Sequence, residues 1–338
     1  MWSYIVRKLV YNVPVYLGII LLTMAALRVR DPVAGYLGKN ATQEQIDRLT
    51  QDMGLDRPFY EQYGKFLWQI VRLDFSEESW AQRGRTVKQI LIDAIPPSMS
   101  ITVPSVVASA FIALVVSLIS AYFRGRLIDR TLVFFAVLGM SISYLVYIIF
   151  GQFFGAFLPL HQQWEFTPFA IQGYEAWTSW SHLSVLGLNI PYPNGIKFEN
   201  WIEYCMLPVI IGVIVAMGYD TRFYRAVMVE ESNKDYIVTA MAKGASKPKI
   251  MFVHMLKNAM IPIITRIMAT LPFLITGSIL LEMYFNIPGM GRELITALIA
   301  NDFPVIQAFV SVLALLFILS IILTDVLYAL VDPRVRLS

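Results

Sequence analysis

The chain has 338 residues, of which 57% are hydrophobic and 15% are charged, and its mean hydropathy is +0.60. Soluble globular domains contain about 45–50% apolar and about 25% charged residues, so this composition predicts a polytopic membrane protein. The one cysteine, Cys205, excludes an internal disulfide framework and a cysteine zinc cluster. The three histidines show no metal-ligand spacing, and a net charge of +3 gives no argument for nucleic acid. We therefore expect no metal or cofactor in this chain.

Six apolar windows are long enough to cross a bilayer, whose ~30 Å hydrocarbon core takes about 20 helical residues. They run at 9–27, 99–123, 131–157, 205–221, 260–285 and 305–330. The predicted fold class is therefore an all-α polytopic membrane protein with six transmembrane helices.

The positions of the positive charges predict the orientation. Fourteen Lys and Arg residues lie in segments 1–8, 124–130, 222–258 and 331–338, which alternation places on one side. The short segments on the other side, 158–204 and 286–304, hold only Lys197 and Arg292. Cytoplasmic loops carry the excess of Lys and Arg, so both termini are predicted to be cytoplasmic. The long segment 28–98 balances ten basic with ten acidic residues and does not bear on the orientation.

The two longer outer segments differ in character. Residues 42–55, "TQEQIDRLTQDMGL", and 58–73, "PFYEQYGKFLWQIVRL", are predicted to be short helices. Segment 158–204 is rich in Trp, Pro and Gly. It is interpreted either as an aromatic belt at the outer interface or as a docking surface for an external partner.

A short helix is predicted within the cytoplasmic segment 222–258. Asn233 or Asp235 can cap its start, and Gly244 suits a left-handed stop. Ser246 can cap a second helix that has Pro248 in its first turn. One face of the short helix carries an apolar stripe made of Tyr236, Ile237, Ala240 and Met241. A short isolated helix is marginal in water, so the stripe must be covered by this chain's own spans or by a cytoplasmic partner.

Residues 230–265, "EESNKDYIVTAMAKGASKPKIMFVHMLKNAMIPIIT", resemble the EAA loop of ATP-binding-cassette (ABC) importer permeases. The likeness is greatest to the dipeptide and oligopeptide branch, of the first-permease kind. The matching positions are Asp235, Tyr236, Thr239, Ala240, Ala242, Lys243, Gly244, His254, Leu256, Asn258, Ala259 and Pro262. Further stretches at 53–63, 286–307 and 325–337 also match that branch.

The resemblance implies the type I importer permease fold and its division of the chain. Residues 1–98 would hold the first span and an outer segment, 99–330 the permease core with the loop 222–258, and 331–338 a cytoplasmic tail. It also implies a multi-pass location in the cytoplasmic membrane. Within the loop, the resemblance assigns ATPase coupling to eight residues, namely Asp235, Tyr236, Ile237, Thr239, Ala240, Met241, Lys243 and Gly244.

The partners implied by the resemblance are a homologous second permease, two cytoplasmic ATPases, an external solute-binding protein and the lipid bilayer. This chain has no P-loop, so ATP and Mg²⁺ would be bound by the partner ATPases, and the chain itself would not be an enzyme. Peptide is the expected solute, with nickel chelates and oligosaccharides left open.

Four charged residues fall in or at the end of the windows, namely Asp220, Arg266, Glu282 and Asp325. Charge inside a membrane is costly unless it is paired or wetted. We interpret Arg266 and Asp325 as lying near the cytoplasmic ends, where they reach headgroups or pair at a subunit interface, and Glu282 as lying near the outer end. Paired carboxylates at mid-span would instead indicate an ion-coupled transporter or channel, which is the alternative function.

Overall fold

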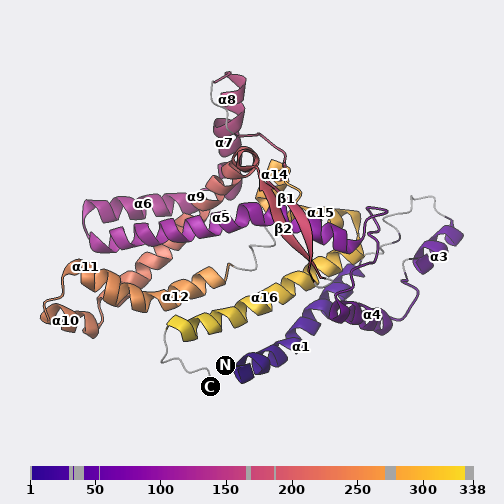
Figure 1. The fold of residues 1–338 in the computed structure, drawn as a ribbon, viewed down its shortest axis with the longest axis horizontal. Coiled ribbons are helices and arrows are strands. Elements are labelled where there is room, and N and C mark those ends of the chain that lie inside the picture. Colours follow the sequence, from indigo (N-terminus) through magenta and orange to yellow (C-terminus); the bar gives the residue numbers. More distant parts are fainter. Residues whose placement is uncertain are drawn as a thin grey trace.

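The structure is a computed structural model of the chain, and it describes residues 2–29, 33, 42–52, 54–164, 169–185, 188–270 and 279–331. The helices pack lengthwise in a flattened bundle (Figure 1). Among the described residues, six helices are long and apolar enough to cross a membrane. These candidate spans are Val6–Leu27, Val87–Tyr122, Tyr144–His161, Phe198–Ser232, Lys247–Met268 and Phe303–Leu327. The prediction of six spans is confirmed.

Four predicted windows correspond to single long helices. They are α1 (Trp2–Leu27), α5 (Val87–Tyr122), α9 (Phe198–Ser232) and α16 (Phe303–Val331). Each extends beyond its apolar window because helical backbone bonds continue into polar residues. The start of α5 is a capping box, in which the Thr86 hydroxyl accepts from the Gln89 N–H and the Gln89 side chain accepts from the Thr86 N–H. α5 runs continuously across residue 98, where the predicted outer segment ends and the predicted permease core begins. That division of the chain stays a prediction.

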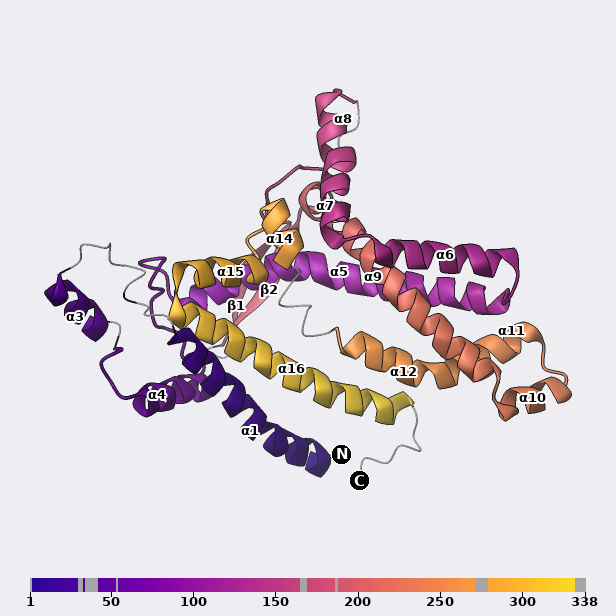
Figure 2. The same cartoon turned by 180° about the vertical axis from the view of Figure 1, so that it is seen from behind.

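The third window, 131–157, is not one helix. It contains α6 (Leu127–Ser141) and then a rod made of α7 (Tyr144–Gln152), the π-helical turn η1 (Phe153–Phe157) and α8 (Leu158–His161). Extended backbone at Ile142 and Ser143 separates the two parts, with ψ near 135° and 140°. The rod stands out from the bundle (Figure 2). Tyr147 secures the bend, because its hydroxyl donates to the Gly139 carbonyl at 3.0 Å.

The fifth window, 260–285, is also placed differently. The membrane-length helix begins earlier, as α11 (Lys247–Lys249), the π-helical stretch η2 (Ile250–Met255) and α12 (Leu256–Met268). The later part of the window holds α14 (Ile279–Phe285), and residues 271–278 lie outside the described part of the chain. Polar residues such as Lys249 and Lys257 hid the start of this helix from an apolar-run search.

The outer segments contain α3 (Gln43–Asp52), α4 (Phe59–Arg72) and α15 (Met290–Ala300). The first two confirm the predicted short helices. Residues 158–204 include an antiparallel hairpin of β1 (Thr178–Val185) and β2 (Leu188–Ile196), so the all-α prediction missed one small sheet. α3, α4 and α15 lie at the end of the bundle away from α10 (Asp235–Ala242).

The bundle places the predicted cytoplasmic segments together. The start of α1, the end of α16, the α5–α6 turn and α10 all lie toward one end (Figure 2). An ion pair between Lys8 and Asp325 joins α1 to α16 near that end. The predicted tail, 331–338, lies outside the described residues after 331. The same-side arrangement therefore agrees with the charge pattern, which assigns this end to the cytoplasm.

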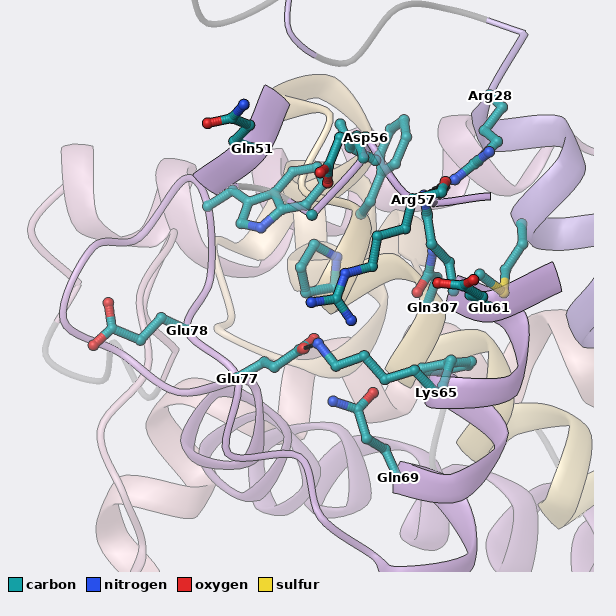
Figure 3. A pocket seen from close by; sticks show the side chains of 18 residues that line it. Arg28, Gln51, Asp56, Arg57, Glu61, Lys65, Gln69, Glu77, Glu78 and Gln307 are labelled. Atoms are coloured by element: carbon teal, nitrogen blue, oxygen red, sulfur yellow. Dashed lines mark hydrogen bonds and ion pairs between the residues drawn. The ribbon is translucent and has the colours of Figure 1, made fainter. Parts of the chain in front are cut away.

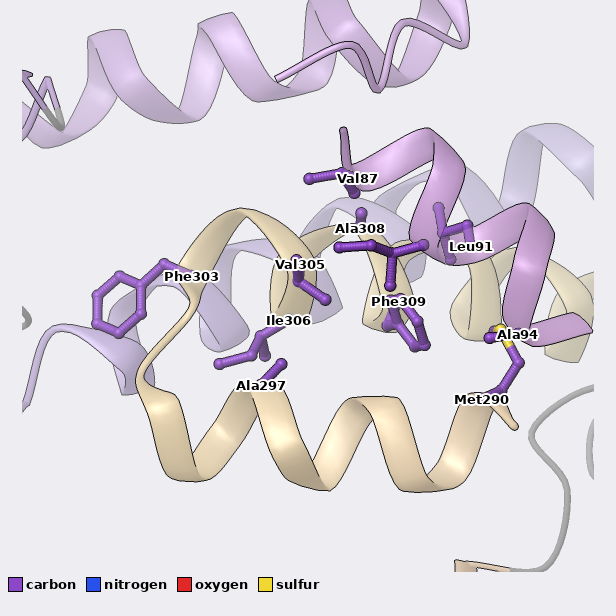
Figure 4. Close-up of a cluster of buried hydrophobic side chains, with 11 residues drawn as sticks. Val87, Leu91, Ala94, Met290, Ala297, Phe303, Val305, Ile306, Ala308 and Phe309 are labelled. Carbon is purple, nitrogen blue, oxygen red and sulfur yellow. The ribbon is translucent and has the colours of Figure 1, made fainter. Parts of the chain in front are cut away.

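Two buried clusters hold the ends of the bundle. At the outer end, Val87 and Leu91 of α5 pack against Met290 and Ala297 of α15 and against Phe309 of α16 (Figure 4). At the cytoplasmic end, a second cluster joins α5, α9, α10 and α12, and its members include Ala113, Tyr224, Met228, Ile237, Ala240, Ile250, Met255, Ala259 and Ile263.

A cavity of about 590 Å³ lies at the outer end, between α4, residues 77–80 and the start of α16 (Figure 3). Its lining mixes charged and amide side chains. Lys65 and Glu77 form an ion pair at 2.5 Å in its wall. This outer cavity is well separated from the predicted coupling segment.

Candidate coupling site

The start of α10 is held by neighbouring side chains and not by a side-chain cap. Lys234 occupies the cap position without a capping side-chain bond, so the predicted caps Asn233 and Asp235 are wrong. Asp235 is instead the first helical residue. The Asn233 side chain accepts a hydrogen bond from Arg124 at 3.2 Å. That bond directs Asn233 toward the α5–α6 turn and away from the α10 backbone.

The end of α10 is the predicted glycine stop. Gly244 has φ +78°, in the left-handed region that favours glycine. Its N–H donates to the Met241 carbonyl at 2.9 Å, and the Ala245 N–H donates to the Ala240 carbonyl at 3.1 Å. These two bonds form the Schellman motif, which satisfies the last carbonyls of a helix. The chain therefore leaves α10 through a sharp turn that two backbone hydrogen bonds define.

A Gly244→Val substitution tests the importance of this turn. No atom lies within 4 Å of a Cβ added at Gly244, so any effect arises from the backbone and not from a clash. A β-branched residue resists positive φ, and strain of this kind costs roughly 1–3 kcal/mol. We expect near-normal protein levels in membranes and strongly reduced solute uptake. Uptake is compared with that of Gly244→Asn, since Asn tolerates the left-handed region. Equal uptake by the Val and Asn variants would contradict the prediction.

The predicted apolar stripe of α10 is covered mainly by this chain. Ile237 is 3% exposed and Ala240 is 9% exposed, and both belong to the cytoplasmic-end cluster with Tyr224 and Met255. Tyr236 packs at the edge of that cluster, and its hydroxyl donates to the Glu231 carboxylate at 2.5 Å. The hypothesis that the whole stripe faces a partner is therefore wrong for these residues, because α9 and η2 already bury them.

The opposite face of α10 is open. Val238 is 59% exposed and Met241 is 54% exposed. Met241 belongs to the predicted coupling set and Val238 does not. The other exposed members of that set are Asp235, Thr239, Lys243 and Gly244. An exposed apolar pair on a helix outside the membrane windows is typical of a protein–protein contact. The assignment of the eight residues to ATPase coupling stays a prediction, and the open face identifies which of them are accessible.

The second helix begins as predicted, directly after the turn. Ser246 occupies the cap position with extended backbone but makes no capping side-chain hydrogen bond, and Pro248 lies in the first turn. Lys247 anchors this start, because its ammonium group donates to the Tyr122 carbonyl at 2.6 Å and lies 4.3 Å from the centre of the Tyr122 ring. The chain then continues through η2 into α12. α10 is thus joined to a membrane-length helix by a short, anchored connection.

A network of charged side chains, which we call the brace, fixes the α5–α6 turn against the end of α9. Arg225 donates through Nε and Nη2 to the two carboxylate oxygens of Asp129, at 2.8 and 2.9 Å. Ser120 and the Gly125 N–H also donate to Asp129. Arg124 extends the contact to Ser232 at 3.2 Å. The hydrogen bonds from Arg225 hold the pKa of Asp129 below its ordinary range.

Sequence reasoning missed the brace, although one signal was present. Segment 124–130, "RGRLIDR", holds a single acidic residue among three arginines. Those arginines were read only as topology signals. Asp129 and Arg225 lie 96 residues apart in sequence, and periodicity within one segment cannot pair them.

The charged residues in the windows have partners within this chain, whereas the interpretation gave Arg266 and Asp325 the headgroups or a subunit interface. Asp325 pairs with Lys8 at the cytoplasmic end, and Arg266 donates to Asp220 at 3.0 Å. Glu282 accepts hydrogen bonds from Ser98 at 2.6 Å and from the Arg292 N–H at 3.0 Å. The fifth helix begins at Lys247, within the predicted cytoplasmic segment, so the placement of Arg266 near the cytoplasmic side stays a prediction.

Six membrane-length helices in the described part of the chain, with the short helix α10 packed at the cytoplasmic end, are the arrangement expected of a transport permease. Residues 113–337 match the family described as binding-protein-dependent transport system inner membrane component, and residues 1–102 match its N-terminal membrane component. The chain belongs to this family, whose fold is that of type I ABC importer permeases. It is therefore a multi-pass protein of the cytoplasmic membrane.

Named relatives align with the chain over its full length. The probable peptide ABC transporter permease protein y4tP of Sinorhizobium fredii is 29% identical over 338 residues, covering 99% of this chain and 100% of the relative. The dipeptide transport system permease protein DppB of Escherichia coli K12 is 29% identical, covering 99% of each chain. The oligopeptide transport system permease protein AppB of Bacillus subtilis is 28% identical, covering 99% of this chain and 100% of the relative.

Proposed function

We propose that this chain is one permease subunit of an ATP-driven importer of peptides. It forms the translocation path with a homologous second permease, receives its solute from an external binding protein and is driven by two cytoplasmic ATPases. ATP and Mg²⁺ are bound by those ATPases and not by this chain. The names of the relatives, which include dipeptide and oligopeptide systems, support the solute class.

One observation carries the coupling part of the proposal. α10 buries Ile237 and Ala240 in its own chain while leaving Val238 and Met241 open at the cytoplasmic end. A helix that is fixed on one side and apolar on the other can accept a partner and pass its movement to the spans. The anchored connection from Gly244 to α12 supplies the rigid link. Allosteric coupling needs such an element, because two sites must bias the same two-state equilibrium.

The proposal is tested by uptake in membrane vesicles that contain the assembled importer. Radiolabelled alanyl-alanine is offered with the external binding protein, and ATP or ADP is enclosed on the ATPase side. We expect accumulation with ATP and none with ADP, and co-purification of the ATPases with this chain. Accumulation driven by an ion gradient without ATP would contradict the proposal and favour the ion-coupled alternative.

A further inference from the structure

The open surface of α12 differs from that of α16. Its four exposed residues are all polar, namely Lys257, Asn258, Thr265 and Arg266, whereas η2, which precedes α12 in the same membrane-length run, exposes Phe252 and Val253. On α16, by contrast, the exposed residues whose burial is described are all apolar, namely Leu315, Phe317, Leu319, Ile321 and Leu323. Polar side chains in membrane helices face the bundle interior or a water-filled cavity and avoid lipid. The open face of α12 therefore lines an aqueous path, and the open face of α16 contacts an apolar surrounding.

Arg266 and its partner lie on the cytoplasmic side of the bundle. Arg266 is ten residues beyond Leu256, where α12 begins, which corresponds to about 15 Å along the helix axis. Asp220 lies two residues before segment 222–258, which the charge pattern assigns to the cytoplasm. The pair is therefore placed just inside the membrane windows.

The geometry of the pair leaves the guanidinium available. Among the described residues, Asp220, whose side chain is 10% exposed, accepts a side-chain hydrogen bond from the Nε–H of Arg266 alone, at 3.0 Å. The Arg266 side chain is 42% exposed, and its two terminal nitrogens make no hydrogen bond or ion pair within the described residues. The terminal nitrogens of a guanidinium form a fork that matches a carboxylate. Asp220 therefore orients a cationic fork toward the polar face of α12.

We propose that Arg266 is a binding station on the solute path, where its guanidinium receives a carboxylate of the passing peptide while Asp220 holds it in position. The inference rests on the proposed function for the identity of the solute. A peptide zwitterion carries a carboxylate at its C-terminus, and it must cross a region where an unpaired charge is costly. A cation that is already compensated by Asp220 can exchange partners without leaving a charge unpaired.

The alternative is that the pair only holds α9 to α12. The two possibilities differ in whether water reaches the face that carries Arg266. Thr265→Cys places a thiol next to Arg266, and Leu319→Cys places one on the apolar face of α16. The native Cys205 is buried, which gives a low background. A charged, membrane-impermeant thiol reagent is applied to the working importer. We expect at least about tenfold faster labelling at 265, because the reactive thiolate forms where water is present.

The binding role is tested by uptake of alanyl-alanine. We expect Arg266→Gln to lower uptake about tenfold, as is typical for the loss of a hydrogen-bonded charge contact. Arg266→Lys, which keeps the charge but not the fork, should give uptake between that of Arg266→Gln and that of the unsubstituted chain, because lysine cannot pair with both carboxylate oxygens in the same way. Arg48→Gln, which makes the same change at an exposed arginine of α3, serves as the matched control. Co-purification of the ATPases with each variant confirms assembly.

Each outcome decides a separate point. Labelling at 265 as slow as at 319 would overturn the aqueous path. Unchanged uptake by the Arg266→Gln variant would overturn the binding station, and so would failure of that variant to assemble, since this would assign the pair to structure. If the unsubstituted importer takes up no dipeptide but Thr265→Cys reacts quickly, the proposed solute class fails and the path remains.

Discussion

A Val238→Asp substitution is expected to release the ATPase subunits while leaving the permease itself stable. Val238 is 59% exposed on the open face of α10, so the new carboxylate is solvated in the isolated chain. In the assembled importer it would be buried without a partner, which costs several kcal/mol. Because each 1.4 kcal/mol changes an equilibrium constant tenfold, we expect binding more than about a hundredfold weaker. The measurements are the ATPase stoichiometry after co-purification and the melting temperature in detergent.

Ala240→Asp is the matched control on the buried face of the same helix. Ala240 is 9% exposed and packs within the cytoplasmic-end cluster, so a carboxylate there must disturb the permease. We expect a lower melting temperature before any effect on ATPase binding. If Ala240→Asp left the melting temperature unchanged and Val238→Asp lowered it, the assignment of the two faces would be reversed.

An Asp129→Ala substitution is expected to destabilise the chain by about 3 kcal/mol, the lower end of the range for breaking a buried ion pair. The Asp129 side chain is 5% exposed, and its loss removes the acceptor of Arg225 Nη2 and of the Gly125 N–H, while Arg225 Nε keeps its bond to the Ser120 hydroxyl. Thermal unfolding in detergent measures the effect. The control is Asp93→Ala, which breaks the exposed pair between Arg85 and Asp93 and should cost less than about 1 kcal/mol. Equal losses in the two variants would contradict a stabilising role of the brace.

The brace also predicts a dependence on pH. Because the pKa of Asp129 is lowered in the folded chain, the unfolded chain binds this proton first as the pH falls. The stabilisation by Asp129 is therefore complete above about pH 4, the ordinary range of an aspartate, and is lost progressively below it. The Asp129→Ala variant should lack this part of the acid sensitivity.

The sequence predicted those features that depend on local chemistry. The six membrane-length helices follow from the apolar runs, and the stop at Gly244 follows from the one residue type that takes φ +78° without strain. The break at Ile142 and Ser143 was not predictable in this way. It lies between Ser141 and Tyr144 and carries neither Gly nor Pro, so it depends on tertiary contacts such as that of Tyr147 with Gly139.

The candidate site shows a second limit of sequence reasoning. Periodicity correctly identified an amphipathic helix at 235–242, but it could not tell whether each face is covered by this chain or by a partner protein. Ile237 faces Tyr224 and Met255 of this chain, and that contact is set by how α9 and α12 cross. The brace depends in the same way on segments far apart in sequence.

The unbroken run from Lys247 to Met268 acts as a lever. From Lys247 to Arg266 it spans 19 residues, or roughly 28 Å at the α-helical rise. A tilt of about 5° at the α10 end would therefore shift Arg266 by on the order of 2 Å. Such a shift exceeds the tolerance of the 3.0 Å bond between Arg266 and Asp220, since hydrogen bonds weaken steeply beyond their usual length. A small stroke delivered at the cytoplasmic surface is thus large enough to separate the charge pair that joins α9 to α12.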